Sequence, residues 1–291
     1  MPETTGGTLY VVATPIGNLE DITLRALRVL GEVDLIAAED TRRTRKLLNH
    51  FALKTPCLSY YRENEARRGE EIMAKLLSGQ MVALVSDAGT PGIADPGARL
   101  VNRVREAGLP VVPLPGASAL AAFLSVAGQT GASHLFLGFL PGRSGERRKL
   151  LQSLATEPHP LVFYESPHRL LKSLADVLAV LGERRVVLAR ELTKIHEEVL
   201  VGELGALLAR LQKRPAIKGE FVVLLAGAEP AALAAERPSG EDFAQLAAWY
   251  RDQAGLSLKD AARQMAIDLD LPRSQVYRRL LELWTTVHQG S

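Results

Sequence analysis

Short apolar runs rich in β-branched residues alternate over most of the chain with segments in which apolar residues recur every three or four positions. This alternation is typical of an α/β domain with a largely parallel sheet. In the first part of the chain it predicts strands near residues 8–14, 34–38, 81–85 and 110–114. It predicts the covering helices at 24–30 and 63–77.

The same alternation restarts after Pro115 and Gly116 and predicts a second α/β domain. Its strands are expected near 134–140, 160–164, 185–189 and 220–225, and its helices near 117–127, 146–155, 168–181 and 203–213. A run rich in Ala, Glu and Pro over 228–240 has the composition of a linker. We therefore predict α/β domains at 1–116 and 117–228, followed by a helical domain at 240–291.

In the last domain, helices expected at 258–267 and 273–283 flank a short turn at 270–272. This pattern is similar to a helix-turn-helix, whose second helix would carry Arg273, Gln275 and Arg278. A small helical bundle that only stabilises the body is the alternative interpretation.

The net charge restricts how the chain could bind an anionic partner, and the cysteine content indicates the cellular compartment. Thirty-five Lys and Arg against 33 Asp and Glu give a net charge of +2, so an anionic partner must be met by a local patch. Two basic clusters are candidates, Arg42–Lys46 and the group Arg143, Arg147, Arg148 and Lys149. The single cysteine, Cys57, excludes an intramolecular disulfide and fits the cytoplasm.

Membrane and secretory signals are not expected in this sequence. Met1 to Thr8 does not resemble a signal peptide. No stretch reaches the roughly 18 uninterrupted apolar residues that a membrane span requires. We therefore expect no membrane partner.

Three corners rich in small residues follow three of the expected strands, at Thr14–Asn18, Ser86–Gly97 and Pro115–Ala119. The carboxyl ends of parallel strands are where ligands bind in open α/β sheets, so the corners predict one cleft for a compact cofactor held by backbone contacts. Neither a G-x-G-x-x-G nor a P-loop motif is present, which removes the main support for a dinucleotide or P-loop site. Ser118 is suited equally to capping the helix that follows it.

Eight segments make the chain similar to the tetrapyrrole methylase superfamily and, within it, to the branch that methylates small-subunit ribosomal RNA. These segments are Thr14–Thr23, Ala38–Arg42, Val85–Gly97, Pro115–Ala119, Gly138–Pro141, Phe163–Arg169, Arg190–Lys194 and Lys218–Glu220. The resemblance runs from Gly7 to about Ala226, and the C-terminal helices resemble the helix-turn-helix extension of the same branch.

The resemblance implies two α/β domains with S-adenosylmethionine in the cleft between them. It also implies methyl transfer to the ribose 2′-hydroxyl of a decoding-region cytidine in 16S rRNA, within the small ribosomal subunit, by a homodimer. The residues that it assigns to the cofactor are Pro15, Asp87, Ala88, Gly89, Ile93, Ala94, Ser118, Ala119, Tyr164, Glu165 and Lys218.

A ribose hydroxyl is a weak nucleophile, so a base or a cation near the developing alkoxide would help the reaction. The catalytic candidates are Glu39, Arg42, Glu165, His168, Lys194 and Glu197, with Asp40 and Arg190 beside them. Each candidate also has a structural alternative. Glu39 and Asp40 can cap the next helix, and His168 can be structural. The charges near 190–198 can form an ion-paired surface. No spacing of His, Asp and Glu resembles a dedicated metal site.

Two other functions remain open at this point. One is methylation of a corrin or porphyrin intermediate, which would need a large apolar trough and no basic arms. The other is a non-catalytic protein that senses S-adenosylmethionine and binds nucleic acid through the C-terminal helices.

Overall fold

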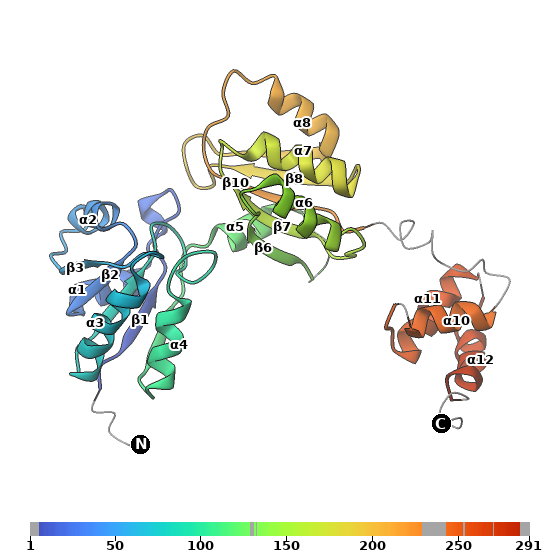
Figure 1. The fold of residues 1–291 in the computed structure, drawn as a ribbon, viewed down its shortest axis with the longest axis horizontal. Coiled ribbons are helices and arrows are strands. Elements are labelled where there is room, and N and C mark those ends of the chain that lie inside the picture. The colour runs from blue at the N-terminus through green and yellow to red at the C-terminus, as the bar shows by residue number, and fades with distance from the viewer. Residues whose placement is uncertain are drawn as a thin grey trace. The chain divides into compact units, whose positions relative to one another are not determined.

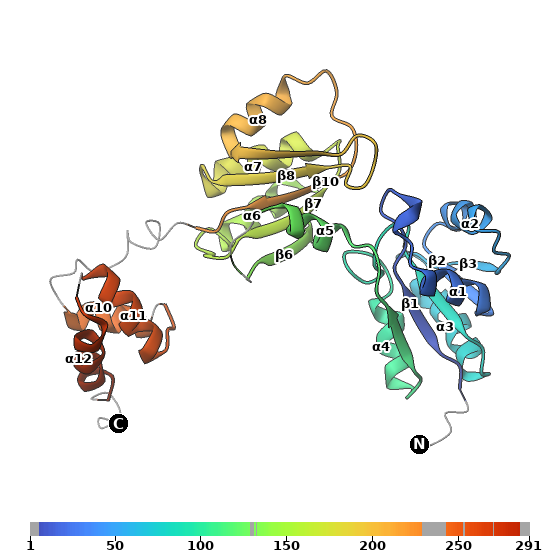
Figure 2. The same cartoon turned by 180° about the vertical axis from the view of Figure 1, so that it is seen from behind.

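The protein is described here by a computed structural model that covers residues 6–128, 131, 133–228, 243–252, 254–269 and 271–285. The chain divides into two compact units, drawn from opposite sides in Figures 1 and 2. Unit 1 comprises Met1–Ala155 and His159–Gly227, and unit 2 comprises Thr156–Pro158 and Ala228–Ser291. As domain limits, 1–116, 117–228 and 240–291 stay predictions, and the expected linker lies outside the described residues from position 229 onward.

Unit 1 contains two five-stranded sheets, and the first is entirely parallel with strand order β3-β2-β4-β1-β5. Its strands are β1 (Leu9–Val12), β2 (Leu35–Ala38), β3 (Cys57–Ser59), β4 (Val82–Val85) and β5 (Val111–Leu114). Strand β3 was not among the expected strands, because three residues at a sheet edge carry almost no periodic signal. Strand β1 lies between β4 and β5, with Leu9 opposite both Val82 and Val111.

Helices cover both faces of the first sheet. They are α1 (Leu24–Glu32), α2 (Thr41–His50), α3 (Glu65–Leu77) and α4 (Ala98–Glu106), with a 3-10 turn η1 at Leu19–Asp21. Helices α1 and α2 bury Leu30 and Leu48 against one face, and α3 and α4 bury Ile72 and Leu100 against the other. This doubly covered parallel sheet brings the carboxyl ends of its strands to one edge.

The second sheet has strand order β6-β7-β10-β8-β9 and is mostly antiparallel. Its strands are β6 (Leu135–Phe139), β7 (Leu161–Glu165), β8 (Arg185–Arg190), β9 (Glu198–Glu203) and β10 (Phe221–Leu225). Only β6 and β7 pair in parallel, so a largely parallel sheet is wrong for this half. The seven-residue connection 191–197 is too short for a parallel crossover, and it makes β8 and β9 an antiparallel hairpin.

Helices α6 (Ser144–Ser153), α7 (Leu170–Leu181) and α8 (Leu204–Gln212) cover one face of the second sheet, where Phe163 packs with Leu174. Helix α5 (Ala119–Val126) lies on the other face and buries Phe123 against Val162 and Val222. Ile16, from the loop after β1, belongs to the same apolar cluster. The first half of unit 1 therefore contributes to the core beneath the second sheet.

Unit 2 is a small bundle of α10 (Phe243–Asp252), α11 (Leu258–Asp268) and α12 (Arg273–Thr285). Its core includes Leu246, Tyr250, Met265 and Leu280, all nearly inaccessible to solvent. This confirms the α/β fold with a C-terminal helical region. Across the described ranges, no helix is both long and apolar enough to cross a membrane.

Candidate functional site

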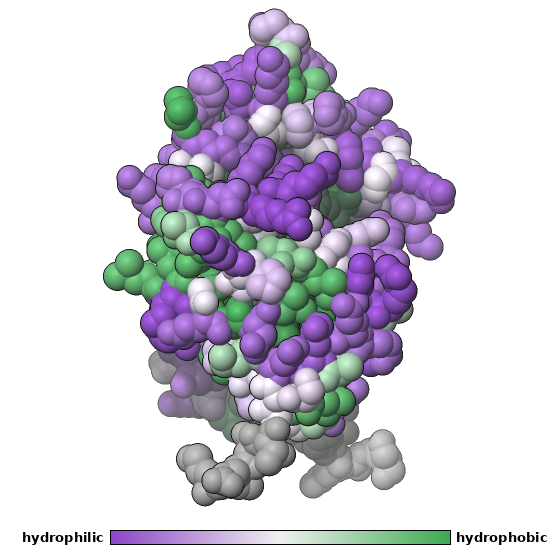
Figure 3. All heavy atoms as spheres, turned by 90° about the vertical axis from the view of Figure 1, so that its left-hand side faces the viewer, coloured by the Kyte–Doolittle hydropathy of each residue, from purple (hydrophilic) through white to green (hydrophobic). Residues whose placement is uncertain are grey.

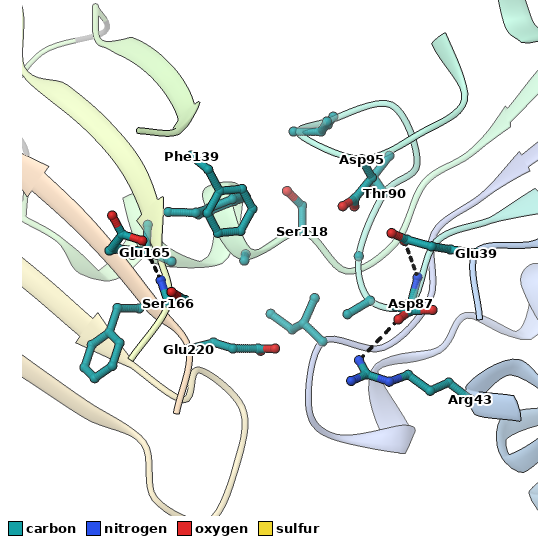
Figure 4. A pocket seen from close by; sticks show the side chains of 18 of the residues that line it. Glu39, Arg43, Asp87, Thr90, Asp95, Ser118, Phe139, Glu165, Ser166 and Glu220 are labelled. Atoms are coloured by element: carbon teal, nitrogen blue, oxygen red, sulfur yellow. Dashed lines mark hydrogen bonds and ion pairs between the residues drawn. The ribbon is translucent and has the colours of Figure 1, made fainter. Parts of the chain in front are cut away.

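A cavity of about 370 Å³ opens in unit 1 where the strand ends of the first sheet face the second sheet. Figure 4 shows Glu39, Asp87 and Asp95 on one side of this space and Glu165 and Glu220 on the other. Its volume is within the range of small-molecule sites. The lining residues are Ile16, Glu39, Arg43, Asp87, Ala88, Gly89, Thr90, Ile93, Asp95, Ser118, Ala119, Phe139, Tyr164, Glu165, Ser166, Pro167, Glu220, Phe221 and Val222.

Backbone contacts join the three small-residue corners to one another. The N–H of Thr14 donates to the carbonyl of Gly89 at 2.8 Å, and the N–H of Gly89 donates back to Thr14 at 2.9 Å. Gly89 has a φ of +79°, a conformation that favours glycine. The hydroxyl of Thr90 donates to the carbonyl of Ala117 at 3.2 Å. The corners therefore form a single rigid wall, as their positions at neighbouring strand ends predict.

Carboxylates gather on this wall. The Asp87 carboxylate accepts the backbone N–H of Asp40 at 2.9 Å and pairs with Arg43 at 3.4 Å, while the N–H of Asp87 donates to Glu39 at 3.3 Å. Burial raises the pKa of Glu39. Burial, followed by the charge of Glu39, raises the pKa of Asp95 to about 6. The wall thus offers negative charge to a cationic ligand.

The opposite wall is aromatic and apolar, with one buried acid. The Tyr164 ring packs edge-on against Phe136 and Phe139, at centroid distances of 5.0 and 5.6 Å. Burial raises the pKa of Tyr164 to about 12, which keeps its hydroxyl protonated at neutral pH. Glu165 is 1% exposed. It already accepts hydrogen bonds from the Ser173 hydroxyl at 2.6 Å and the Ser166 N–H at 2.8 Å and pairs with Arg169 at 3.2 Å.

The cavity brings together most of the residues expected to hold a cofactor. Eight of them line it: Asp87, Ala88, Gly89, Ile93, Ser118, Ala119, Tyr164 and Glu165. Pro15 lines a smaller hollow beside the cavity, which shares Arg43 and Asp87 with it. Ala94 and Lys218 are outside both linings, and the carbonyl of Lys218 accepts the Arg190 Nε–H at 2.6 Å.

Of the catalytic candidates, Glu39 and Glu165 line the cavity, whereas Arg42, His168, Lys194 and Glu197 do not. Glu197 accepts the N–H of Thr193 at 2.6 Å. All six catalytic roles stay predictions.

Two of the four catalytic candidates that do not line the cavity form salt bridges with nearby carboxylates. Arg42 is mostly exposed and pairs with Asp40 at 2.8 Å. Lys194 bridges Glu191 and Glu220, at 2.9 Å each. Burial lowers the pKa of Lys194, but its hydrogen bonds to the two acids outweigh burial and raise it. Lys194 therefore stays protonated and holds Glu220 at the cavity wall.

The sequence predicts the wrong environment for one basic residue, Arg147. Arg147 was expected in a basic cluster open to an anionic partner, but its side chain is 4% exposed and pairs with Asp176 at 2.5 Å. It also donates to the carbonyl of Pro141 at 3.0 Å. The buried face of α6 and the acid on α7 explain the error, because a contiguous run of charges does not reveal which one points inward. Arg148, in contrast, is half exposed.

Several lining residues were not identified from the sequence. Thr90, Asp95 and Glu220 lie inside motifs recognised above, and their position next to predicted cofactor residues was the available signal. Phe221 and Val222 belong to an apolar strand with no such signal. Within the described part of the chain, no group of three or more His, Cys, Asp and Glu is placed to hold a metal.

The arrangement can bind a compact ligand that carries charges of both signs. Small side chains at Ala88, Gly89 and Ala119 let a ligand approach the backbone, and the acidic wall favours a cation. The start of α5, capped by Ser118, presents the positive end of the helix dipole to a carboxylate.

The family model described as Tetrapyrrole (Corrin/Porphyrin) Methylases matches residues 8–208. Three curated relatives, each named ribosomal RNA small subunit methyltransferase I, are 48% identical to this chain. The one from Synechocystis sp. aligns over 95% of this chain and 98% of its own length, and the one from Escherichia coli O157:H7 over 95% of each. The relative from Thermotoga maritima aligns over 77% of this chain and all of its own length.

Solved structures share the fold at low sequence identity. A uroporphyrin-III C-methyltransferase from Thermus thermophilus, complexed with S-adenosylhomocysteine, has a TM-score of 0.54 and 18% identity, over 78% of this chain and all of its own. A conserved hypothetical protein from Aeropyrum pernix K1 has a TM-score of 0.60 and 20% identity, over 79% of this chain and 89% of its own. At this identity, both show a shared fold with this chain.

Proposed function

Because the chain belongs to the tetrapyrrole (corrin/porphyrin) methylase family, within its ribosomal RNA small subunit methyltransferase I group, we propose that it methylates a ribose 2′-hydroxyl of 16S rRNA. The protein is an S-adenosylmethionine-dependent methyltransferase of small-subunit ribosomal RNA. The finer proposal is that the acceptor is a decoding-region cytidine. The observation that carries the function is 48% identity over 95% of the chain to relatives of that name.

The cavity residues fit S-adenosylmethionine, which joins a cationic sulfur and an ammonium group to a carboxylate and a nucleoside. Asp87 and its neighbours on the acidic wall would hold the cationic part, and the start of α5 at Ser118 would hold the carboxylate. Ala88 and Gly89 leave room beside the backbone for the nucleoside. When bound, the cofactor would supply a methyl group for transfer from its sulfur to an oxygen nucleophile.

The protein's own contribution is mainly to position the reacting groups. The hydrogen bonds among Glu39, Asp40 and Asp87 fix the ends of β2 and β4 relative to each other. Phe139 and Tyr164 give the opposite side an aromatic surface. The protonated Tyr164 hydroxyl remains available as a hydrogen-bond donor.

RNA would reach the cavity along helix α2. Arg42, Arg45 and Lys46 are exposed on this helix, whereas Arg43 also lines the cavity. The side of unit 1 that faces the viewer in Figure 3, on which Figure 1 draws α2, has many hydrophilic side chains around an apolar area in its middle. The small hollow that shares Arg43 with the cavity lies between this helix and the loop after β1. Phosphates bound on α2 would therefore place a nucleotide next to the cofactor.

Three further parts of the proposal concern the setting of the enzyme. We propose that the substrate is the rRNA within the small ribosomal subunit, that the enzyme acts in the cytoplasm, and that two copies form a homodimer. The single cysteine supports a reducing compartment. Light scattering coupled to gel filtration tests the dimer, which should elute with twice the 31.6 kDa mass of one chain.

The proposed function is tested by incubating the protein with small ribosomal subunits, and separately with naked 16S rRNA, in the presence of methyl-labelled S-adenosylmethionine. Nuclease digestion and mass spectrometry then locate the label. We expect a 2′-O-methylcytidine in the decoding region, with more product from subunits than from naked rRNA.

Other outcomes would replace parts of the proposal. A label on a base, or on another ribose, would keep the rRNA methyltransferase and refute the acceptor. Cofactor binding without any labelled RNA would instead favour a tetrapyrrole substrate, and uroporphyrinogen is the probe to try next.

A further inference from the structure

Asp95 lies in the loop between β4 and α4 and lines the cavity. The backbone of this loop has an uncommon conformation around Asp95. Ala94, which precedes it, has a φ of +67°, and Gly92 and Gly97 have φ values of +81° and +129°. A non-glycine residue in the left-handed region persists only where its surroundings hold it, and such residues cluster at functional sites. Figure 4 shows the Asp95 side chain facing the same space as Glu39.

Contacts on both sides of Asp95 hold the loop in place. The hydroxyl of Thr90 donates to the carbonyl of Ala117 at 3.2 Å, and the N–H of Gly97 donates to Glu65 at 3.0 Å. A β-carbon on Gly97 would lie 2.7 Å from Cδ2 of Leu84, so the loop end is packed closely against β4. A side chain on such a support is positioned reproducibly, as a reacting group requires.

The other carboxylates around the cavity are already occupied. Asp87 pairs with Arg43, Glu165 with Arg169, and Glu220 with Lys194. Glu39 accepts the N–H of Asp87. In the described part of the chain, Asp95 forms no salt bridge within 4.0 Å, and the nearby Ser86 hydroxyl acts to lower its pKa.

The groups that face Asp95 come from four elements: Glu39 after β2, Ser86 and Asp87 after β4, Arg62 before α3 and Tyr164 on β7. Burial, followed by the charge of Glu39, raises the pKa of Asp95 to about 6, against 3.8 for an ordinary aspartate. The carboxylate is therefore ionised at pH 7 to 8 and is a stronger base than an unperturbed one. General bases work best with a pKa near the working pH.

Building on the proposed function, we propose that Asp95 is the general base that deprotonates the attacking ribose hydroxyl. In this step the O–H bond breaks and the proton moves to an Asp95 oxygen. The ribose oxygen forms a bond to the methyl carbon, and the carbon–sulfur bond breaks with its electron pair remaining on sulfur. Sulfur becomes a neutral thioether, and Asp95 later releases the proton to water.

The experiment compares wild type with Asp95→Asn and Asp95→Glu, and uses Glu106→Gln, an exposed acid on α4, as the matched control. The readouts are the single-turnover methylation rate on small subunits between pH 5 and 9 and the affinity for S-adenosylhomocysteine by calorimetry. We expect Asp95→Asn to slow methyl transfer about 10²- to 10⁴-fold. Its affinity for S-adenosylhomocysteine should stay within about threefold of wild type, and Asp95→Glu should recover part of the rate.

The pH profile gives a second readout. The wild-type rate should rise with pH and level off above about 6, and this acidic limb should be missing in Asp95→Asn. A ¹³C titration of the aspartate carboxyls should show one group that titrates near pH 6 in wild type and is missing from Asp95→Asn, with no substrate present.

Three results would overturn the assignment. One is an Asp95→Asn rate within about fivefold of wild type, and another is an acidic limb that persists in that variant. The third is a loss of cofactor affinity as large as the loss of rate, which would make Asp95 a cofactor ligand instead. Wild type that methylates no RNA would refute the proposed function itself, so the two failures are distinguishable.

Discussion

Gly17, in the loop after β1, and Lys194, in the loop between β8 and β9, approach so closely that a β-carbon on Gly17 would lie 2.4 Å from Cγ of Lys194. The same β-carbon would lie 2.7 Å from Oγ1 of Thr193 and 3.0 Å from the carbonyl of Leu192. These loops belong to different sheets, and Ile16 next to Gly17 lines the cavity. The absence of a side chain at Gly17 therefore sets how closely the two sheets meet at the site.

We expect Gly17→Ala to destabilise the protein by about 1–3 kcal/mol, because the added methyl forces one loop to move. Affinity for S-adenosylhomocysteine should fall as the cavity wall shifts. Gly145→Ala is the control, since its β-carbon would meet no atom within 4 Å. Urea unfolding and calorimetry measure the two effects. Equal stability of both variants would contradict the expected crowding at Gly17.

Asp176 should be essential to the second half of unit 1. Burial opposes its ionisation, but hydrogen bonds from Arg148, Ser144 and Arg147 outweigh burial and lower its pKa. We expect Asp176→Asn to cost about 3–5 kcal/mol, because it leaves the buried Arg147 guanidinium unpaired. Arg148→Met, which removes a half-exposed partner, should cost less than about 1 kcal/mol.

The sign of the pH dependence follows from the lowered pKa of Asp176. The ionised Asp176 stabilises the folded state above the ordinary aspartate pKa of 3.8. This stabilisation is lost as the pH falls through the lower pKa that the group has in the folded protein. Urea unfolding should therefore show the Asp176→Asn defect fully at pH 7 and a smaller one at pH 3. A defect of equal size at both pH values would refute the ionic explanation.

Asp95 should have the opposite effect on stability. Its pKa rises from 3.8 to about 6 on folding, so the folded state loses stability as the pH increases from about 4 to 6 and does not regain it above. We expect Asp95→Asn to raise the unfolding temperature at pH 8 and not at pH 4. The gain should be well below the roughly 3 kcal/mol equivalent of two pKa units, because water still reaches the group. Glu106→Gln should not change the unfolding temperature at pH 8 or at pH 4.

Exposed cations on α2 should control the salt dependence of RNA binding. We expect the double variant Arg45→Ala and Lys46→Ala to reduce the slope of log K against log salt by about 1.5, for two lost phosphate contacts. The control replaces Lys75 and Arg105, on the helices α3 and α4 that cover the other face of the sheet. A change of slope as large in the control would indicate non-specific attraction.

Unit 1 should bind the cofactor without unit 2, because every residue that lines the cavity belongs to unit 1. A chain ending at Gly227 should retain its affinity for S-adenosylhomocysteine within about twofold by calorimetry. A larger loss would show that the helical unit contributes to the cofactor site.

Local periodicity predicted most elements, but it did not predict strands β3 and β9 or helices α2 and α4. Strand β4 is an uninterrupted buried run, Val82–Val85, and was readily predicted, whereas β3 has only three residues. Strand β9 lies next to charged residues, with Glu198 at its start, and the expected ion-paired surface concealed it. Strand direction in the second sheet depends on the length of its connections, which hydrophobic periodicity does not report.

The sequence by itself determined the α/β architecture and the wall formed by the three small-residue corners. Periodicity sets strands and helices, and small residues after β1, β4 and β5 must meet because parallel strands end at the same edge. Only the tertiary structure decided which charges point inward. Arg147 is buried against Asp176, Glu165 is saturated with partners, and Asp95 faces the cavity without forming a salt bridge to any residue of the described ranges. The physical reason is that burial and ion pairing depend on side chains from distant segments, and spacing along one segment does not encode them.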